Sequence, residues 1–347
     1  MQDIVPNICS GKDRISNSGE VALYGSTGVI GRTNSASYKE NIVLVARVGA
    51  NAGQMQIGNA PCGVTDNTLV IDAKEWNYYI YYFLQHYNLN RLVFGSGQPL
   101  ITGGMLKRIK VRYGCKAERN NITRLLCLID ERIATQNKII EKLQSLIKGL
   151  SQQLLSSEND WILYRLDDLA QIKSGYSGTQ VSYQTPYKVS RIETISKHCI
   201  DIQRIGYVEC IPESYRLNVG NILFSNINSI QYIGNTAYLD KDYGLYHGMN
   251  LLRIIPNTTI VRPRFLHLLL CTDWAINHFQ TICNKAVSQA SINQTALGKS
   301  RFPIPPMSVQ QQICSMFELT ERKLDNEQEY ISCLQQQKRY LLQKMFI

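Results

Sequence analysis

The sequence predicts an α+β fold that is built twice along one chain, each copy being a globular part followed by a long helix. The first observation is a run of apolar residues with coiled-coil spacing at 122–155. The second is that this run recurs, 191 residues later, near the C-terminus. The third is that short β-rich segments and one apolar helical segment precede each long helix. Two copies indicate a pseudo-dimer on one chain, because a solenoid needs at least three repeats.

The first long helix is predicted from its apolar residues, whose spacing alternates between three and four positions. This spacing is typical of a coiled-coil seam, whereas a helix in a globular core has a broader apolar stripe. The seam residues are Leu126, Ile129, Ile133, Gln136, Ile140, Leu143, Ile147, Leu150 and Leu154. We expect the helix to run from near Glu118 to Leu155, a length of about 57 Å at a rise of about 1.5 Å per residue.

The second long helix repeats the register of the first without a gap, so that Ile331 stands where Ile140 stood. A chance pair of amphipathic helices would share the period but would not match along a whole run at one offset. Upstream of the helices, 97–101 aligns with 288–292 at the same offset. The sequence therefore predicts that the repeat includes the globular parts.

The first globular part is predicted to consist of short strands joined by glycine-containing turns. Its predicted strands lie at 10–14, 24–31, 42–48 and 64–71. A helix is predicted over 76–93, where apolar side chains recur at helical spacing, and a glycine-rich loop over 94–104.

The second globular part begins at Trp161, after a polar boundary, and follows the same plan. Its predicted strands lie at 187–192, 221–226 and 251–255, and its predicted helix lies at 263–279. Ser308 is predicted to cap the second long helix, with Gln311 completing a capping box.

Composition favours an acidic partner. The formal net charge is +10 and the isoelectric point is near 9.0, which suits nucleic acid, although a soluble basic protein explains the charge equally well. The ten cysteines form no C-x-x-C pair, so we expect free thiols in a reducing cytoplasm rather than a zinc site. No signal peptide and no long apolar run are recognised, so the expected location is cytoplasmic, without membrane contact.

These features together resemble the DNA-specificity (S) subunit of Type I restriction–modification systems. The resemblance rests on the twofold repeat, the Y-G-S-T-G-V-I-G loop at 24–31, the R-V-G-A-N-A-G run at 47–53, and the P-I-P-P-M-S-V-Q-Q-Q-I segment at 303–313. It implies two globular target-recognition domains separated by two long antiparallel coiled-coil helices, with a pseudo-twofold internal repeat. Each domain would read one half of a split DNA target, and the helices would dock two methyltransferase subunits.

On this resemblance the chain divides into four parts. They are a first target-recognition domain at 1–112, a central helical spacer at 113–156, a second target-recognition domain at 157–304 and a C-terminal helical spacer at 305–347.

Catalytic motifs are not recognised in the sequence. An adenine methyltransferase needs a loop of the N-P-P-Y or D-P-P-Y type, and the glycines at 25–31 lack the Lys-Ser/Thr of a P-loop. Asp66, Asp72 and Lys74 have the order of a metal-nuclease motif, but a structural turn is the preferred interpretation. The five histidines lack metal-ligand spacing.

Candidate DNA contacts are basic and amide side chains in loops and at strand ends. Arginine reads guanine, and Asn or Gln reads adenine, although most such residues contact phosphate or water. In the first domain the candidates are Lys12, Arg14, Arg32, Arg47 and Gln98. In the second domain they are Lys173, Lys188, Arg191, Asn226, Asn228 and Gln289. Gln98 and Gln289 are equivalent under the repeat, and the alternative role of both is to cap a loop.

The predicted function is a non-catalytic subunit that reads DNA sequence within a restriction–modification complex. The expected partners are double-stranded DNA, two methyltransferase subunits, and restriction or translocase subunits. No cofactor is expected on this chain, since S-adenosylmethionine would bind the methyltransferase partner. The alternatives are a coiled-coil adaptor that binds only proteins and an enzyme with an unrecognised site.

The middle of the seam carries one further prediction. Gln136 lies near the midpoint of the first long helix, and its repeat equivalent in the second is Glu327. If the two helices are antiparallel about a pseudo-twofold axis, these side chains should meet there. A polar pair in an apolar seam penalises slipped alignments and so would fix the register.

Overall fold

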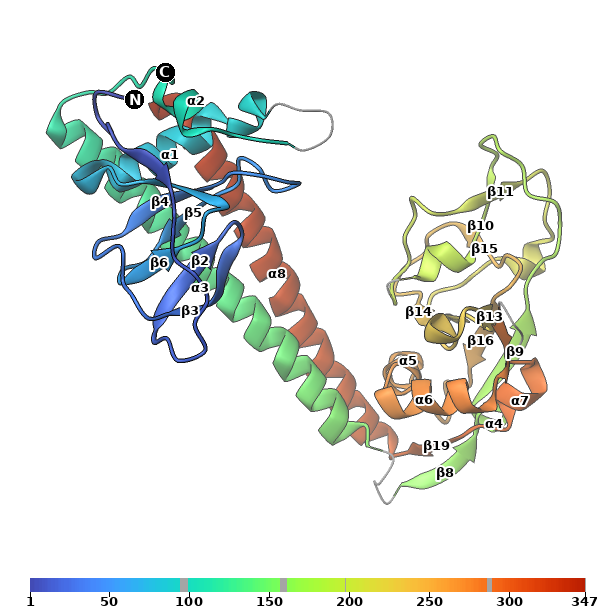
Figure 1. The fold of residues 1–347 in the computed structure, drawn as a ribbon. Coiled ribbons are helices and arrows are strands. Elements are labelled where there is room, and N and C mark those ends of the chain that lie inside the picture. The colour runs from blue at the N-terminus through green and yellow to red at the C-terminus, as the bar shows by residue number, and fades with distance from the viewer. Residues whose placement is uncertain (94–98, 157–160, 197, 286–288, 347) are drawn as a thin grey trace. The chain divides into compact units, whose positions relative to one another are not determined.

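The structure is a computed structural model that describes residues 1–93, 99–156, 161–196, 198–285 and 289–346. The chain forms two compact units, and each unit combines one globular domain with parts of both long helices (Figure 1). The first unit comprises Met1–Ile139 and Glu327–Ile347, and the second comprises Ile140–Asn326.

The domain of the first unit contains two sheets. The larger sheet has the order β1-β7-β4-β5 and is antiparallel throughout. Its strands are β1 (Ile8–Ser10), β4 (Ile42–Ala46), β5 (Met55–Gly58) and β7 (Thr68–Ile71). The smaller sheet has the order β3-β2-β6, with β2 (Val21–Gly25), β3 (Gly28–Thr33) and β6 (Cys62–Val64). Alternate residues of β4 serve two cores, since Val43 packs with the helices and Leu44 packs with the smaller sheet.

The helices of this domain cover one face of the larger sheet. They are the 3-10 helices at Lys74–Trp76 and Leu89–Leu92, α1 (Asn77–Tyr87) and α2 (Gly103–Lys107). The predicted helix at 76–93 is thus shorter than expected, because Asn88 adopts a left-handed conformation (φ 59°) that ends α1. The predicted strand at 64–71 is wrong as one element, because a turn separates β6 from β7.

The domain of the second unit repeats this plan with additions. Its central sheet has the order β14-β12-β16-β9, with β9 (Ala170–Ser174), β12 (Ile222–Phe224), β14 (Thr236–Tyr238) and β16 (Leu252–Pro256). A second sheet contains β10 (Tyr187–Val189), β11 (Gly206–Val208) and β15 (Leu245–Tyr246). Two small sheets contain β13 (Ile227–Asn228), β17 (Asn284–Lys285) and β18 (Ala290–Ser291), and β8 (Ile162–Arg165) with β19 (Arg301–Ile304).

The helices of the second domain differ from the prediction in one place. They are α4 (Leu166–Leu169), α5 (Pro263–Leu270), α6 (Asp273–Ile282), α7 (Gln294–Gly298) and the 3-10 helices at Ile192–Ile195, Glu213–Tyr215 and Ile230–Tyr232. The single helix predicted at 263–279 is two helices, α5 and α6. The chain breaks at Thr272, whose hydroxyl accepts a hydrogen bond from the Ala275 amide (3.3 Å) and so caps α6.

The second long helix begins 191 residues after the first begins and ends 191 residues after the first ends, which is the offset of the repeat. The two helices are α3 (Lys116–Leu154) and α8 (Met307–Met345), each of 39 residues. Every predicted seam residue of α3 is buried or half-buried. In each unit the two helices run antiparallel, and the predicted α+β class with its internal repeat is confirmed. Ser308 is the second residue of α8, so the prediction that it caps this helix is wrong.

The polar pair in the seam forms as predicted, within the first unit. The Gln136 side-chain amide donates a hydrogen bond to the Glu327 carboxylate and lies 3.5 Å from the Glu327 backbone carbonyl oxygen. Only 5% of Gln136 is exposed. The interaction therefore sits inside the seam, where an unpaired polar group would be costly.

One carboxylate in each unit joins the globular domain to the long helices. In the first unit, Asp130 of α3 accepts a hydrogen bond from the Tyr82 hydroxyl of α1 (2.9 Å) and pairs with Lys338 of α8 (2.6 Å). In the second unit, Arg264 of α5 pairs with Glu321 of α8. Glu321 is the repeat equivalent of Asp130, so both domains are attached at matching helix positions.

Replacing both Gln136 and Glu327 with leucine should raise the free energy of unfolding by about 1 kcal/mol or more, because apolar residues would fill the seam. Urea denaturation measures this change. The single variant Gln136→Leu is the control, and it should be less stable than the wild type because the Glu327 carboxylate loses its amide donor in the seam. A double variant less stable than the wild type would contradict the assignment of this pair as a device for register.

Candidate nucleic-acid interface

The predicted contacts of the first domain lie on a braced loop and at strand ends. Lys12 and Arg14 are exposed and flank Asp13, whose carboxylate accepts hydrogen bonds from the Val64 amide (2.8 Å) and the Ser37 hydroxyl (2.6 Å). The loop also passes close to the backbone of β6. A Cβ added at Gly11 would lie 2.1 Å from the Val64 carbonyl oxygen, so this position requires glycine. The loop therefore presents its two cations from a fixed backbone.

The two other described candidates of this domain, Arg32 and Arg47, differ in their exposure. Arg32 is exposed on β3 and donates to the Glu20 carbonyl oxygen (3.2 Å). Arg47 follows β4, is half-buried and donates to the Ser10 hydroxyl (3.1 Å). Gln98 lies outside the described residues, so its predicted contact stays a prediction.

In the second domain, three of the candidates come together. Strand β13 pairs with β18, which places Asn226 and Asn228 beside the segment that carries the exposed Gln289. Both asparagine amides are used locally, since the Asn226 amide donates to the Ile292 carbonyl oxygen (3.4 Å) and the Asn228 amide donates to the Ser225 hydroxyl (3.2 Å). The Asn226 side-chain oxygen is buried without a hydrogen-bond partner. Asn226 therefore keeps one acceptor that its own fold does not use.

The remaining candidates of this domain lie on two different sheets. Lys173 is exposed on β9, and Lys188 is exposed on β10. Arg191 follows β10 and pairs with Glu193 at 3.4 Å, with both side chains largely exposed, so this ion pair adds little stability.

Matching backbone hydrogen bonds show that the strand ends of the two domains are equivalent. The Ile101 amide donates to the Arg47 carbonyl oxygen (2.9 Å), and the Ile292 amide donates to the Asn226 carbonyl oxygen (2.8 Å). Ile292 is the repeat equivalent of Ile101. Arg47 and Asn226 therefore occupy the same place in the two domains.

Sequence reasoning missed the most buried lysine or arginine among the described residues of the second domain. Arg253 lies in the middle of β16 and is only 5% exposed. Its direct cross-strand neighbour is Lys173 of β9. The available signal was a single arginine inside the apolar run at 251–255, where a strand residue is expected to be apolar or to carry a specific role.

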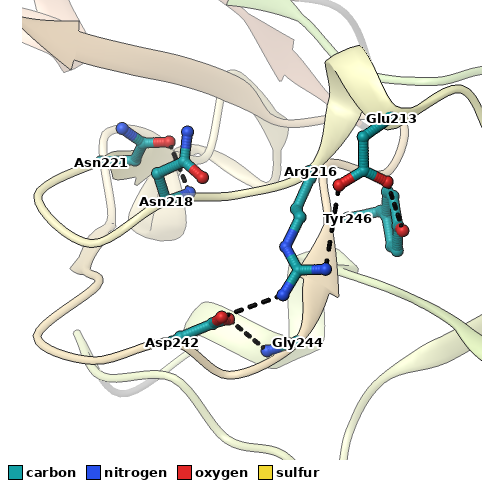
Figure 2. A network of polar contacts seen from close by, with 7 residues as sticks. All are labelled: Glu213, Arg216, Asn218, Asn221, Asp242, Gly244 and Tyr246. Atoms are coloured by element: carbon teal, nitrogen blue, oxygen red, sulfur yellow. Dashed lines mark hydrogen bonds and ion pairs between the residues drawn. The ribbon is translucent and has the colours of Figure 1, made fainter.

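A network of polar contacts lies around the 3-10 helix at Glu213–Tyr215, whose Ser214 carbonyl oxygen accepts a hydrogen bond from Arg253 (Figure 2). Arg216 pairs with Asp242 (2.9 Å) and Glu213 (3.8 Å), and Glu213 also accepts a hydrogen bond from the Tyr246 hydroxyl (2.8 Å). The Gly244 amide and the Arg216 guanidinium both lower the pKa of Asp242. These contacts hold the 3-10 helix at Glu213–Tyr215 against the turn that precedes β15.

A cavity of about 1270 Å³ opens in the second unit, and it is lined by α5, α6 and parts of both long helices. There Arg264 donates to the Nδ1 atom of His267 (3.0 Å), and burial lowers the pKa of His267 to about 3.

Across the described parts of the chain, no group of three His, Cys, Asp or Glu residues is placed to hold a metal ion. Within those same parts, no helix has the length and apolar character required to cross a membrane.

The chain matches the sequence model of the Type I restriction modification DNA specificity domain twice, at residues 8–155 and 158–336. Since these matches cover nearly the whole chain, the protein belongs to this family of DNA specificity domains. The two matches coincide with the two copies of the internal repeat.

Two curated relatives come from Methanocaldococcus jannaschii. The putative type I restriction enzyme MjaX specificity subunit is 38% identical over 193 residues, which are 54% of this chain and 45% of that protein. The match therefore spans less than half the length of that relative. The type I restriction enzyme MjaVIII specificity subunit is 23% identical over 311 residues, which are 78% of this chain and 70% of that protein.

Solved structures share the fold. The S subunit of a Type I restriction–modification system from M. genitalium superposes with a TM-score of 0.68 at 16% identity, covering 98% of this chain and 93% of that one. A chain from a structural study of type I R-M system assembly and conformational transition gives a TM-score of 0.59 at 13% identity, covering 98% of this chain and 95% of that one.

One buried histidine, His247, allows a prediction of how the stability of the protein depends on pH. Burial lowers the pKa of His247 from 6.5 to about 4, since the residue is only 1% exposed, and the nearby Arg253 charge lowers it further. Between these values the unfolded chain binds a proton that the folded chain does not, so stability falls as the pH falls from 6.5 towards 4. This residue alone would contribute on the order of 3 kcal/mol over that window.

Urea denaturation of the wild type and of His247→Gln at several pH values between 7 and 4 tests this expectation. The variant should lose less stability on acidification than the wild type does. Equal pH dependence in the two proteins would mean that His247 is protonated in the folded chain as readily as in the unfolded chain.

Proposed function

We propose that this chain is the sequence-reading subunit of a Type I restriction–modification complex, and that each globular domain reads one half of a split DNA target. The observation that carries this proposal is the repeat, because each copy matches the DNA specificity domain separately. Two similar domains with different side chains at equivalent strand ends suit a bipartite, asymmetric target with an unread spacer. The net charge of +10 supports binding to the phosphate backbone.

The long helices support a second part of the proposal, which is that they dock two copies of a methyltransferase subunit. Leu125 and Leu128 of α3 face away from the seam and are 39% and 49% exposed. Their repeat equivalents on α8, Met316 and Leu319, are 43% and 57% exposed. Exposed apolar pairs at equivalent positions suit two copies of one partner, since exposed apolar groups of this kind commonly mark protein interfaces.

In this proposal the chain itself is non-catalytic and acts in the cytoplasm. The methyltransferase partner would bind S-adenosylmethionine, and restriction or translocase subunits would complete the assembly. A coiled-coil adaptor without DNA specificity is the less favoured alternative, because both halves of the chain match a DNA specificity domain.

Exchange of residues 161–302 for the matching segment of a relative tests the two-reader arrangement. One half of the target should change and the other should stay, because each domain has its own core and its own strand ends. Sequencing the methylated sites of a host that carries the chimera measures this. A target in which both halves change, or neither does, would contradict independent reading.

Charge placed on the exposed helix faces should remove the methyltransferase copies one at a time. The variants Leu125→Glu/Leu128→Glu and Met316→Glu/Leu319→Glu should each weaken one docking site by about 2 kcal/mol, which is roughly 30-fold in affinity. Native mass spectrometry of the reconstituted complex counts the bound copies.

The matched control for this experiment is Asn121→Glu/Asn137→Glu, which adds the same two charges to exposed polar positions of α3. The control should retain both copies. If the apolar-face variants also retain both, these faces do not dock the methyltransferase.

A further inference from the structure

A small pocket in the second unit contains cations without carboxylates. It has a volume of about 430 Å³ and lies where β9 and β16 meet the 3-10 helix at Glu213–Tyr215. Its polar lining includes Lys173, Ser174, Ser214, His247, Arg253 and Gln294. Among the described residues that line it, none is acidic.

Two cations face each other across the strands at this pocket. Lys173 and Arg253 are direct partners in the antiparallel ladder of β9 and β16, so their side chains leave the same face of the sheet. Like charges at such a position destabilise a sheet. Burial adds a second cost, because it disfavours the charged guanidinium and lowers the pKa of Arg253.

The hydrogen-bond acceptors of Arg253 are neutral. Its Nε donates to the side-chain oxygen of Asn221 (2.8 Å), and its Nη1 donates to the Ser214 carbonyl oxygen (3.3 Å). Within the described chain it forms no ion pair with a carboxylate. A guanidinium has five N–H donors, so these two bonds leave donors available to a ligand. The buried charge is therefore balanced only in part by the protein.

The contrast with Arg216 shows that carboxylates are close by but committed elsewhere. Arg216 is half-buried and pairs with both Glu213 and Asp242, which are exposed (Figure 2). Asn221, which bonds to Arg253, belongs to a separate set of contacts: its side-chain oxygen accepts from the Asn218 amide (3.0 Å) as well as from Arg253. Among the described residues, Arg216 therefore has carboxylate partners, whereas Arg253 has none.

The remaining groups of the pocket suit an anion. Ser174 and Ser214 are exposed at its edge and can donate hydroxyl hydrogen bonds. His247 adds no positive charge near neutral pH, since burial lowers its pKa to about 4. The positive charge available to a ligand is therefore that of Lys173 and Arg253.

The first domain shows that the fold does not require these cations. At the equivalent ladder position it pairs Cys9 with Val70, between β1 and β7. Gly103 stands where the second domain has Gln294. The two cations are thus an addition to the shared scaffold, confined to one of its two copies.

We propose that this pocket binds a phosphate group, and that in function the phosphate belongs to the DNA backbone beside the half-target of the second domain. The inference rests on the proposed DNA-reading function and extends it. Arg253 presents its guanidinium from a fixed position, which suits the oxygens of a phosphate, and Lys173 contributes a point charge. Lys173 is then a backbone contact that positions the domain, and it does not read a base.

The variant Lys173→Gln tests the proposal with the full-length chain. Lys173 is exposed, so its loss should leave the fold intact, whereas loss of Arg253 would also remove the bonds to Asn221 and Ser214. Binding of fluorescent duplex DNA of several unrelated sequences is measured over a series of salt concentrations. We expect affinity to fall about tenfold for every sequence and the salt slope to decrease by about 0.9.

The matched control is Lys299→Gln, which removes one exposed positive charge outside the pocket. The control should keep the salt slope of the wild type. If both variants lower the slope equally, or if Lys173→Gln changes affinity for only some sequences, the assignment of a phosphate pocket is overturned.

A second measurement separates the possible sources of the phosphate. Inorganic phosphate should raise the melting temperature of the wild type more than that of Lys173→Gln, and this comparison removes the general stabilisation by the salt. A difference here with unchanged DNA binding would mean a free phosphate ligand and would overturn the backbone assignment. No difference in either measurement would overturn the pocket altogether.

Failure of the proposed function has a separate signature. If the wild type binds no DNA, alone or with a methyltransferase partner, the proposed DNA-reading function is wrong. The assignment of the bound phosphate to the DNA backbone is then wrong as well. The melting comparison with inorganic phosphate then still decides whether the pocket binds an anion.

Discussion

The apolar seam between α3 and α8 is the contact on which the rest of the structure depends. In the first unit, Leu126 of α3 and Leu342 and Phe346 of α8 belong to the same core as the domain residues Tyr79 and Phe83. In the second unit, Ile313 and Phe317 of α8 belong to the domain core, and Leu150 and Leu154 of α3 pack against it. Each domain is therefore built onto the helix pair, and a helix that slipped would disrupt the core of the domain it supports.

Polar groups in and beside this seam make its register specific. The contact between Gln136 and Glu327 exists at one alignment only, since the neighbouring seam positions are apolar. Asp130 adds a second constraint, because it is bonded to Tyr82 of the domain and to Lys338 of the facing helix. Apolar side chains tolerate small shifts, whereas these paired groups lose their partners when the helices slide.

The sequence predicted what depends on periodicity and local repetition. The seam and the offset between α3 and α8 both follow from residue spacing. The prediction from sequence was wrong where a single side chain ends or starts a helix. Thr272 is such a residue, because it caps α6 and so divides the predicted helix in two. The pocket around Arg253 was missed because it also needs Lys173. Lys173 is far from Arg253 in the sequence, and strand pairing places the two residues opposite each other.

Under the proposed function, comparison of the two copies indicates how one scaffold can present different contacts to DNA. The backbone bonds at the strand ends are the same in both domains, yet they display Arg47 in one and Asn226 in the other. The ladder position that holds Cys9 and Val70 in the first domain holds Lys173 and Arg253 in the second. Cys9 and Lys173 are exposed, so they can change at little cost to the core. Val70 and Arg253 are buried, so the exchange between them changes the interior of the sheet. Under the proposed function, divergence at the exposed positions can alter base and phosphate contacts separately, while the register of the helices stays fixed.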